Sequence, residues 1–423
     1  MHLHLGVVHT CKMTEVSIRG CLKAERKRCI TPFLRLGVID SRLQGLNYQL
    51  RMANKNLNAA KTAKKDEFYT QMIDIARELQ HYWPHFRDKV VLCNCDDPYE
   101  SNFFKYFALN FNQLGLKKLI CTCFDGSPVL GNELLLDFGD FTDDPKKMAY
   151  KVEITEVKDL NGDGAVDLAD VQYLLKNDKN AISLLKQHGD FRSAECIELL
   201  KEADIVVTNP PFSLFREYIG QLMEYGKKFI IMGRMSALHY SEVFPLIMQN
   251  KLWCGVNFNI SAVYKAPYEN TLDANRKFVL SKGLNPDDNY IKVPAICWYT
   301  NLDHNKRHEV LDLVSRYSPE DYPNYANYDA IDVGRVQDIP FDFDGIMGVP
   351  DTILGQYNPE QFEIVGLGSG NLGQSIGVGG IPKEHKKLMK GHSAAGDLYI
   401  LINGIPKVPY SRILIRNKHP QTI

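Results

Sequence analysis

The apolar stretch at residues 204–208 runs directly into Asn209-Pro210-Pro211-Phe212, and this junction restricts the fold more than any other part of the sequence. A short apolar run of this length is typical of a fully buried strand. Proline has a fixed φ angle and no backbone N–H, so two prolines in succession end the strand in a rigid turn. The sequence therefore predicts a buried central strand with polar acceptors held at its end.

The turn after this strand suits one chemical problem, the methylation of an exocyclic amine. The side-chain oxygen of Asn209 and the carbonyl of Pro210 can both accept hydrogen bonds, while Pro211 offers no competing N–H. The N6 nitrogen of adenine is a poor nucleophile because its lone pair is delocalised into the ring, and two acceptors on its hydrogens would draw that pair back. Phe212 offers a face for a flipped base, and such stacking is worth about 1–3 kcal/mol, comparable with the cost of extruding the base. The alternative is an ordinary turn between a strand and a helix.

Strand-like and helix-like segments alternate from residue 66 onward, which predicts a doubly wound α/β domain with a Rossmann-like sheet. We expect strands at residues 89–95, 117–123, 204–208, 228–233, 252–256 and 293–300, with two more at 399–403 and 411–415, and helices at 99–112, 214–225 and 241–249. Sheets of this kind bind their ligands at the carboxyl ends of the parallel strands. The Asn-Pro-Pro-Phe turn lies at such an end, so we expect a cofactor beside it.

Three groups of residues that precede this turn could hold S-adenosylmethionine: Phe68, Tyr69 and Thr70; Asp97, Pro98 and Ser101; and Asp190 with Phe191. The first group offers backbone and hydroxyl groups to the cofactor carboxylate. The second follows the first expected strand, where an acid and a tight turn can meet the methionyl part. In the third, the carboxylate could accept from the adenine amino group while the aromatic ring packs on the adenine. Any one group alone could be a capped helix or an acidic turn, and their joint order is what predicts a methyltransferase.

The chain divides into three regions by sequence texture. Residues 1–51 are rich in Arg, His and Cys without a helical or alternating pattern, so we expect a disordered extension or a start site placed too far upstream. Residues 52–300 carry the alternation of the catalytic methyltransferase domain, with an insertion at about 125–188 and a polar segment at 257–292 that suits target contacts. Residues 301–423 predict a smaller C-terminal domain that recognises or supports DNA.

Composition limits the partners of the protein. A net charge of −1 over 423 residues argues against a basic coat, so contacts with phosphates must come from local patches such as residues 1–65 or the tail after Asp397. Both basic regions could also be solvated ends. No apolar run approaches the ~20 residues of a membrane helix, and no signal-peptide core follows the first residues. We therefore expect a cytoplasmic protein without a membrane partner, its ten cysteines reduced.

The insertion contains a segment with the spacing of a calcium-binding loop, residues 159–170. Its oxygen side chains include Asp159, Asn161, Asp163 and Asp170, and a glycine stands at the sixth position. A bound calcium ion would be structural, because methyl transfer from a sulfonium needs no metal. The alternative is an Asp-rich turn that caps the helix after it.

Four segments closely resemble the EcoRI-type adenine-specific DNA methyltransferases: residues 65–70, 93–98, 189–193 and 204–218. Later landmarks of that family are similar to residues 347–350, 358–362 and 412–415, so the resemblance covers about residue 52 to about residue 418. It implies S-adenosylmethionine-dependent N6 methylation of adenine within a short site in double-stranded DNA. It also implies a separate restriction endonuclease as the usual partner.

The chain departs from the family pattern in two places. Residues 233–237 lack the usual Asn-containing turn, and residues 262–292 match less well, so we transfer no recognition sequence. The motif after the first expected strand also lacks the Gly-x-Gly of most methyltransferases, and in this respect it is similar to the EcoRI-type family.

Two other functions stay open from the residues alone. Asn-Pro-Pro-aromatic turns also serve enzymes that methylate glutamine amides or bases in RNA, which would change the acceptor and keep the enzyme class. A non-enzymatic docking or DNA-binding scaffold would use the calcium-like loop and bind no cofactor.

Overall fold

The computed structural model describes residues 69–95, 97–98, 101–125, 149–159, 168–177, 182–265, 273–288, 290–389 and 393–421. The chain divides into two compact units, residues 1–63 and 64–423, and all described residues belong to the second. The expected extension at residues 1–51, the predicted cofactor residue Phe68 and the predicted calcium ligands Asn161 and Asp163 lie outside the described residues.

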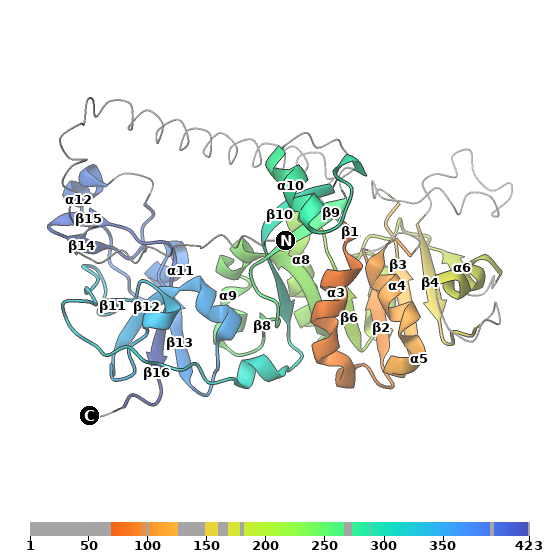
Figure 1. Ribbon diagram of the computed structural model, residues 1–423, viewed down its shortest axis with the longest axis horizontal. Helices are drawn as coiled ribbons and strands as arrows, with labels where there is room; N and C mark the ends of the chain where they lie inside the picture. Colours follow the sequence, from red (N-terminus) through yellow and green to blue (C-terminus); the bar gives the residue numbers. More distant parts are fainter. Residues whose placement is uncertain are drawn as a thin grey trace, which may run out of the picture. The chain divides into compact units, whose positions relative to one another are not determined.

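Helices and strands alternate as far as the long strand β10, and short strands and turns predominate after it (Figure 1). The strands are β1 (Tyr69–Thr70), β2 (Val90–Cys93), β3 (Lys118–Thr122), β4 (Tyr150–Ile154), β5 (Ile182–Leu184), β6 (Ile205–Thr208), β7 (Lys228–Arg234), β8 (Trp253–Cys254), β9 (Ile260–Lys265), β10 (Tyr290–Thr300), β11 (Ile331–Asp332), β12 (Ile346–Pro350), β13 (Phe362–Leu367), β14 (Ile400–Ile402), β15 (Ile405–Lys407) and β16 (Arg412–Asn417). The α-helices are α3 (Met72–Leu79), α4 (Asn102–Leu109), α5 (Phe111–Leu114), α6 (Leu168–Asn177), α7 (Ala194–Glu202), α8 (Phe215–Glu224), α9 (Phe244–Met248), α10 (Asp273–Ser281), α11 (Gly370–Ser375) and α12 (Lys383–Leu388). The 3₁₀ helices are η2 (Gln80–His85), η5 (Phe212–Leu214), η6 (Met235–His239), η7 (Pro286–Asp288), η8 (Asn305–His308), η9 (Val336–Asp338) and η10 (Asp351–Gln356). None of the described helices is long and apolar enough to cross a membrane.

The largest sheet joins ten described strands in the order β1-β9-β10-β7-β6-β2-β3-β4-β5, with β8 also paired to β10. The four inner strands β7, β6, β2 and β3 are parallel, and the strands on either side of them are antiparallel. The strand that leads into Asn-Pro-Pro-Phe is β6, and it is a central strand as expected, with β7 on one side and β2 on the other. The carboxyl ends of the four parallel strands meet at one edge of the sheet, called the carboxyl edge below. Ligands of doubly wound sheets bind at such an edge.

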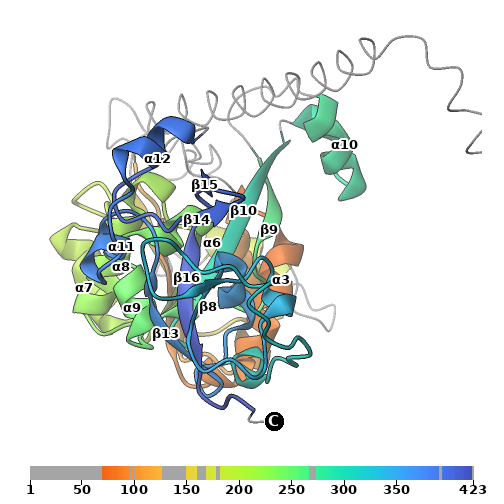
Figure 2. The ribbon, with the colours of Figure 1, turned by 90° about the vertical axis from the view of Figure 1, so that its left-hand side faces the viewer.

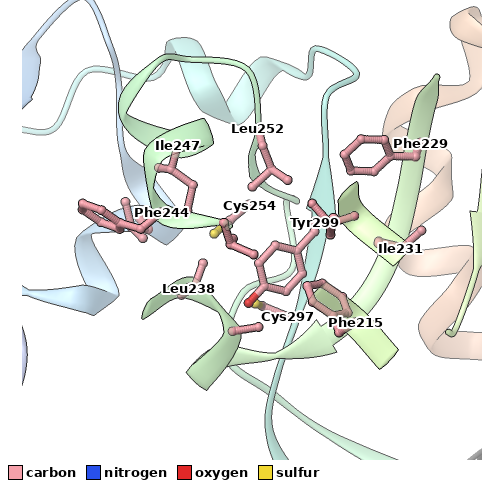
Figure 3. Packing of buried hydrophobic residues seen from close by; sticks show 14 of the residues in the cluster. Phe215, Phe229, Ile231, Leu238, Phe244, Ile247, Leu252, Cys254, Cys297 and Tyr299 are labelled. Carbon is pink, nitrogen blue, oxygen red and sulfur yellow. The ribbon is translucent and has the colours of Figure 1, made fainter. Parts of the chain in front are cut away.

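The inner strands are apolar on both faces because helices cover both faces. On β6, Ile205 and Val207 enter one core and Val206 enters the other, as the alternation of side chains along a strand requires. Helices α3 and α4 contribute to the first core, whereas α7 and α8 contribute to the second. Figure 2 shows α3 on one side of the sheet and α7 and α8 on the other. Tyr299 packs beside Phe215 in the second core (Figure 3).

A second sheet follows in the chain, with the order β11-β12-β16-β13, and β14 pairs with β15 as a separate two-stranded ribbon. Buried residues of the second sheet, among them Met347 and Ile413, belong to the same core as Phe215 and Phe244. The two sheets therefore share one continuous core. The strands expected at residues 399–403 and 411–415 correspond to β14 and β16.

Two segments differ from the pattern expected from the sequence. The polar segment 257–292 contains β9 and α10, and β9 pairs with both β1 and β10. Ala262, Val263 and Tyr264 are all buried. β9 therefore lacks the alternation of buried and exposed residues by which a half-buried strand is identified. The single helix expected at 99–112 is divided into α4 and α5 at Asn110, where the backbone leaves the helical region.

Candidate active site

The carboxyl end of β6 delivers the Asn-Pro-Pro-Phe turn to the carboxyl edge. The parallel pairing of β6 with β7 ends at Thr208, so Asn209 is the first residue beyond the ladder. Asn209 is 6% exposed, and both prolines are buried. Phe212 is half-buried and opens η5, which leads into α8. The prolines thus end the strand and start a helix within three residues.

Two buried side chains join this turn to the end of β2. Thr208 donates its hydroxyl hydrogen to the carbonyl of Asn94, and Tyr218 on α8 donates to the side-chain oxygen of the same asparagine. Asn94 is 3% exposed and follows β2 directly. Sequence reasoning did not assign a role to Asn94 or Tyr218. The available signal was a polar residue at the end of an apolar strand.

The chain reverses sharply after β2 and buries an acid at the carboxyl edge. Cys95 has a φ of +63°, in the left-handed region that non-glycine residues rarely adopt. Asp97, which follows, is 5% exposed and accepts a hydrogen bond of 3.1 Å from the hydroxyl of Tyr150 on β4. Burial raises the pKa of Tyr150 and the carboxylate of Asp97 raises it further, so this hydroxyl remains a donor.

The other predicted residues of this group help to build the turn. Pro98 is buried, and Ser101 donates its backbone N–H to the carbonyl of Asp97 over 2.6 Å. The hydroxyl of Ser101 caps α4 by accepting from Phe103 N at 3.1 Å and Phe104 N at 3.4 Å. Capping was the alternative explanation for such a serine, and the structure shows that it applies.

The described part of the segment 68–70 lies close to the start of α4. Tyr69 and Thr70 form β1, which pairs with β9. The side chain of Asn102 donates to the carbonyl of Thr70 over 2.7 Å, and the hydroxyl of Thr70 approaches Met232 Sδ at 3.3 Å. The structure therefore brings Thr70 together with the turn that carries Asp97, although the two segments are distant in sequence.

The third predicted group lies beside α8. The backbone N–H, Nε and Nη2 of Arg192 donate to the carboxylate of Asp190 over 2.7–2.9 Å, and these hydrogen bonds lower the pKa of Asp190. Nη1 of Arg192 donates to Glu217 over 2.8 Å. Phe191 is 5% exposed, and its ring meets the ring of Tyr218 edge to face at 5.0 Å. Asp190 therefore already has a cationic partner, and Phe191 is part of the core.

Gly189 allows this loop to reach the end of β3. Its φ is +72°, and a Cβ atom there would lie 2.0 Å from the carbonyl oxygen of Cys123. Only glycine can hold the chain this close to the backbone of the neighbouring strand. The position of Asp190 at the carboxyl edge depends on this approach.

Two arginines flank the turn on the other side. The guanidinium of Arg234, at the end of β7, lies 5.9 Å from the ring centre of Phe212. The guanidinium of Arg216 lies 4.1 Å from the ring centre of Tyr240. Arg216 also lies 3.8 Å from the carboxylate of Glu242.

The predicted calcium loop is described only at its two ends. Asp159 is half-buried, and Asp170 is fully buried in the first turn of α6. The described residues contain no group of three or more His, Cys, Asp or Glu side chains that could hold a metal ion. An acid in the first turn of a helix also fits the alternative reading as a capping turn. Calcium binding remains an unsupported prediction.

The family model described as adenine-specific methyltransferase EcoRI matches residues 56–418. The chain belongs to this family. Type II methyltransferase M.EcoRI of Escherichia coli is 43% identical over 379 residues, which cover 87% of this chain and 98% of that protein. Type II methyltransferase M.MpnI of Mycoplasma pneumoniae is 39% identical over 314 residues, covering 73% of this chain and 84% of that protein. No solved structure matches the chain.

Membership confirms the predicted family, the Rossmann-like methyltransferase fold and the enzyme class, a DNA adenine methyltransferase that uses S-adenosylmethionine. The carboxyl edge fits this cofactor. It gathers the buried acid Asp97 after β2, the close loop of Gly189 at the end of β3, and the backbone of Thr70, whose carbonyl accepts from Asn102 at the start of α4. The roles of individual residues and the domain boundaries remain predictions.

Proposed function

We propose that the enzyme flips one adenine out of duplex DNA and methylates its N6 atom in the turn of Asn209, Pro210 and Phe212. The observation that carries the proposal is the position of β6. It is central among the parallel strands and ends in acceptors directly beside the strand that leads to Asp97. A base in this turn and a cofactor at the end of β2 would be neighbours.

The turn would act by accepting hydrogen bonds from the amino hydrogens of the adenine. Asn209 and Pro210 each supply one acceptor, which concentrates the lone pair on N6. Both acceptors are held in place before the base arrives, because the prolines fix the backbone and Thr208 is tied to Asn94. Phe212 would stack on the base, and positioning supplies most of the remaining acceleration. When bound, the cofactor supplies an electrophilic methyl group on a sulfonium.

The cofactor would lie along the ends of β2 and β3. Asp97 and Ser101 would meet its methionyl part, with Tyr69 and Thr70 near its carboxylate. Asp190 would accept from its adenine amino group while remaining paired with Arg192. These roles follow from the predicted positions of the groups and from their gathering at one edge.

The test separates methyl transfer from cofactor binding. We expect Asn209→Ala to lower kcat by about 100-fold or more, the range seen when one preorganised partner of a reacting group is removed. The same variant should bind S-adenosylmethionine with an affinity within a few-fold of the wild type. Ser213→Ala, at an exposed neighbouring position, serves as the matched control. A wild-type kcat in Asn209→Ala would refute the role of the turn.

A separate restriction endonuclease is the partner that we infer for this enzyme. Both relatives named above are type II methyltransferases, a description that belongs to restriction-modification. DNA modified by the enzyme should resist a nuclease encoded beside it. A genome without such a nuclease would favour a solitary methylase.

A further inference from the structure

The β14–β15 ribbon presents apolar side chains to the outside. Its strands pair from Ile400↔Lys407 to Ile402↔Ile405 and are joined by a turn of Asn403 and Gly404, which have φ angles of +50° and +75°. An Asn-Gly turn with two positive φ angles produces a tight, well-defined hairpin. Ile402 is 45% exposed and Ile405 is 62% exposed, so the tip of the hairpin is apolar and uncovered by described residues.

Exposed lysines lie beside this ribbon. Helix α12 lies against β15 and carries Lys383, Lys386 and Lys387, and Lys407 ends β15 itself (Figure 1). All four lysines are exposed, and none forms an ion pair with another described residue. Glu384 is the one acidic residue of α12. The surface therefore combines an apolar tip with positive charge in a protein whose net charge is −1.

The other acid near the ribbon is already engaged. The carboxylate of Asp397 accepts from the hydroxyl of Ser369 over 2.8 Å and from the backbone N–H groups of Gly370 and Ala394. These donors are neutral and the carboxylate keeps its charge, but among the described residues it forms no ion pair with the lysines of α12 and β15. A polyanion is the partner that such a surface attracts.

Strand pairing and hydrogen bonds show at which end of the second sheet the ribbon lies. Arg412, at the start of β16, pairs with Pro350 at the end of β12. The next residue, Asp351, has its carboxylate 3.3 Å from Nε2 of His239, at the end of the 3₁₀ helix that directly follows β7. The ribbon precedes β16, and Leu398 donates its N–H to Gly368, which in turn donates to Arg412. The ribbon thus belongs to the end of the second sheet that approaches the carboxyl edge.

We propose that the β14–β15 ribbon is a DNA-contact element that enters a groove of the duplex whose adenine is flipped into the active site. This inference rests on the proposed function. A two-stranded ribbon fits the width of the major groove, where Ile402 and Ile405 would contact base edges and thymine methyl groups. The lysines of α12 and β15 would contact the phosphates on either side. A purely apolar ribbon would suit a protein partner, but four exposed lysines without an ion pair to any described residue favour DNA.

The test uses two variants of the full-length protein and a matched control for each. The tip variant is Ile402→Ser with Ile405→Ser, and its control is Val310→Ser with Val314→Ser, two valines that are 70% and 81% exposed outside the ribbon. The probe is unmethylated genomic DNA cut into short duplexes. We expect the tip variant to bind this DNA about tenfold more weakly or worse, because the apolar contacts that the two isoleucines would bury against the bases are lost. The DNA affinity of the tip variant should depend on salt concentration as steeply as that of the wild type.

The lysine variant is Lys386→Gln with Lys387→Gln, and its control is Lys89→Gln with Lys251→Gln. The control lysines are exposed and precede β2 and β8, so they lie at the end of the large sheet opposite the carboxyl edge. The lysine variant should reduce the slope of log affinity against log salt by about 1 to 2, because each phosphate contact contributes about 0.9. Both variants should bind S-adenosylmethionine like the wild type.

Affinities equal to those of the controls in both variants would overturn the proposal. A wild-type dimer that the tip variant converts to a monomer, with DNA affinity unchanged, would also overturn it and assign the ribbon to a second copy of the chain. Failure of the proposed function looks different. In that case the wild type itself forms no N6-methyladenine in DNA.

Discussion

The hydroxyl of Tyr218 donates a hydrogen bond to the side-chain oxygen of Asn94, and both side chains are buried. Asn94 follows β2 and precedes the turn to Asp97, whereas Tyr218 is on the helix after the Asn-Pro-Pro-Phe turn. The pair fastens the turn proposed for the base to the turn proposed for the cofactor. Loosening it should affect both stability and catalysis.

Replacing Tyr218 with phenylalanine tests this connection. The variant keeps the aromatic ring but leaves the buried oxygen of Asn94 without this donor, which should cost about 1–3 kcal/mol of unfolding free energy. Urea denaturation measures the loss. Tyr225→Phe, on a half-buried tyrosine just after the same helix, should change the unfolding free energy by less. Equal losses in the two variants would show that the hydrogen bond does not matter.

Gly189 is required both by its backbone angle and by its contact with β3. Gly189→Ala would place a Cβ atom 2.0 Å from the carbonyl of Cys123, whereas Gly226→Ala, with a φ of +61°, would meet nothing within 4 Å. We expect Gly226→Ala to cost about 1–2 kcal/mol for the left-handed conformation alone. Gly189→Ala should cost clearly more and weaken binding of S-adenosylmethionine, because the loop that carries Asp190 must move. Similar melting temperatures and cofactor affinities in the two variants would contradict this.

His304 makes stability depend on pH. Burial lowers the pKa of His304 below its ordinary value of 6.5, although a hydrogen bond of 3.0 Å to the carbonyl of Cys254 acts in the opposite direction. The unfolded chain therefore takes up this proton first as the pH falls. The contribution of neutral His304 to the unfolding free energy is fully present above pH 6.5, and it is lost as the pH falls through the lower pKa of the folded state.

The measurement is the unfolding free energy of the wild type and His304→Gln, taken from about pH 7.5 down to about pH 5. The wild type should lose stability relative to the variant across this range. If the difference in unfolding free energy between the two proteins stays constant with pH, His304 keeps its ordinary pKa in the folded protein.

The central part of the fold could be predicted because its signals are local. An apolar run that ends in two prolines specifies a buried strand and its end, and β6 begins and ends within one residue of the predicted segment 204–208. The expected strand at 228–233 corresponds in the same way to β7. The candidate residues around the carboxyl edge followed from the order of such strands.

The partners of those residues could not be predicted because they come from distant segments. Tyr150, which donates to Asp97, is on β4 within the region treated as an insertion, and β4 joins the sheet in the antiparallel direction. Arg192 is two residues from Asp190, yet nothing in the sequence shows that its side chain folds back onto the carboxylate. The apolar tip of the β14–β15 ribbon was likewise visible only as a strand signal, because exposure depends on the packing of the whole chain.

The most direct test of the central claim is to identify the methyl acceptor. Purified enzyme is incubated with labelled S-adenosylmethionine and, in parallel, with unmethylated genomic DNA, RNA and total protein, and nucleoside mass spectrometry identifies the product. We predict N6-methyladenine in DNA alone, formed by the wild type and almost absent with Asn209→Ala. Label in RNA or protein with none in DNA, from an enzyme that binds the cofactor, would contradict the account.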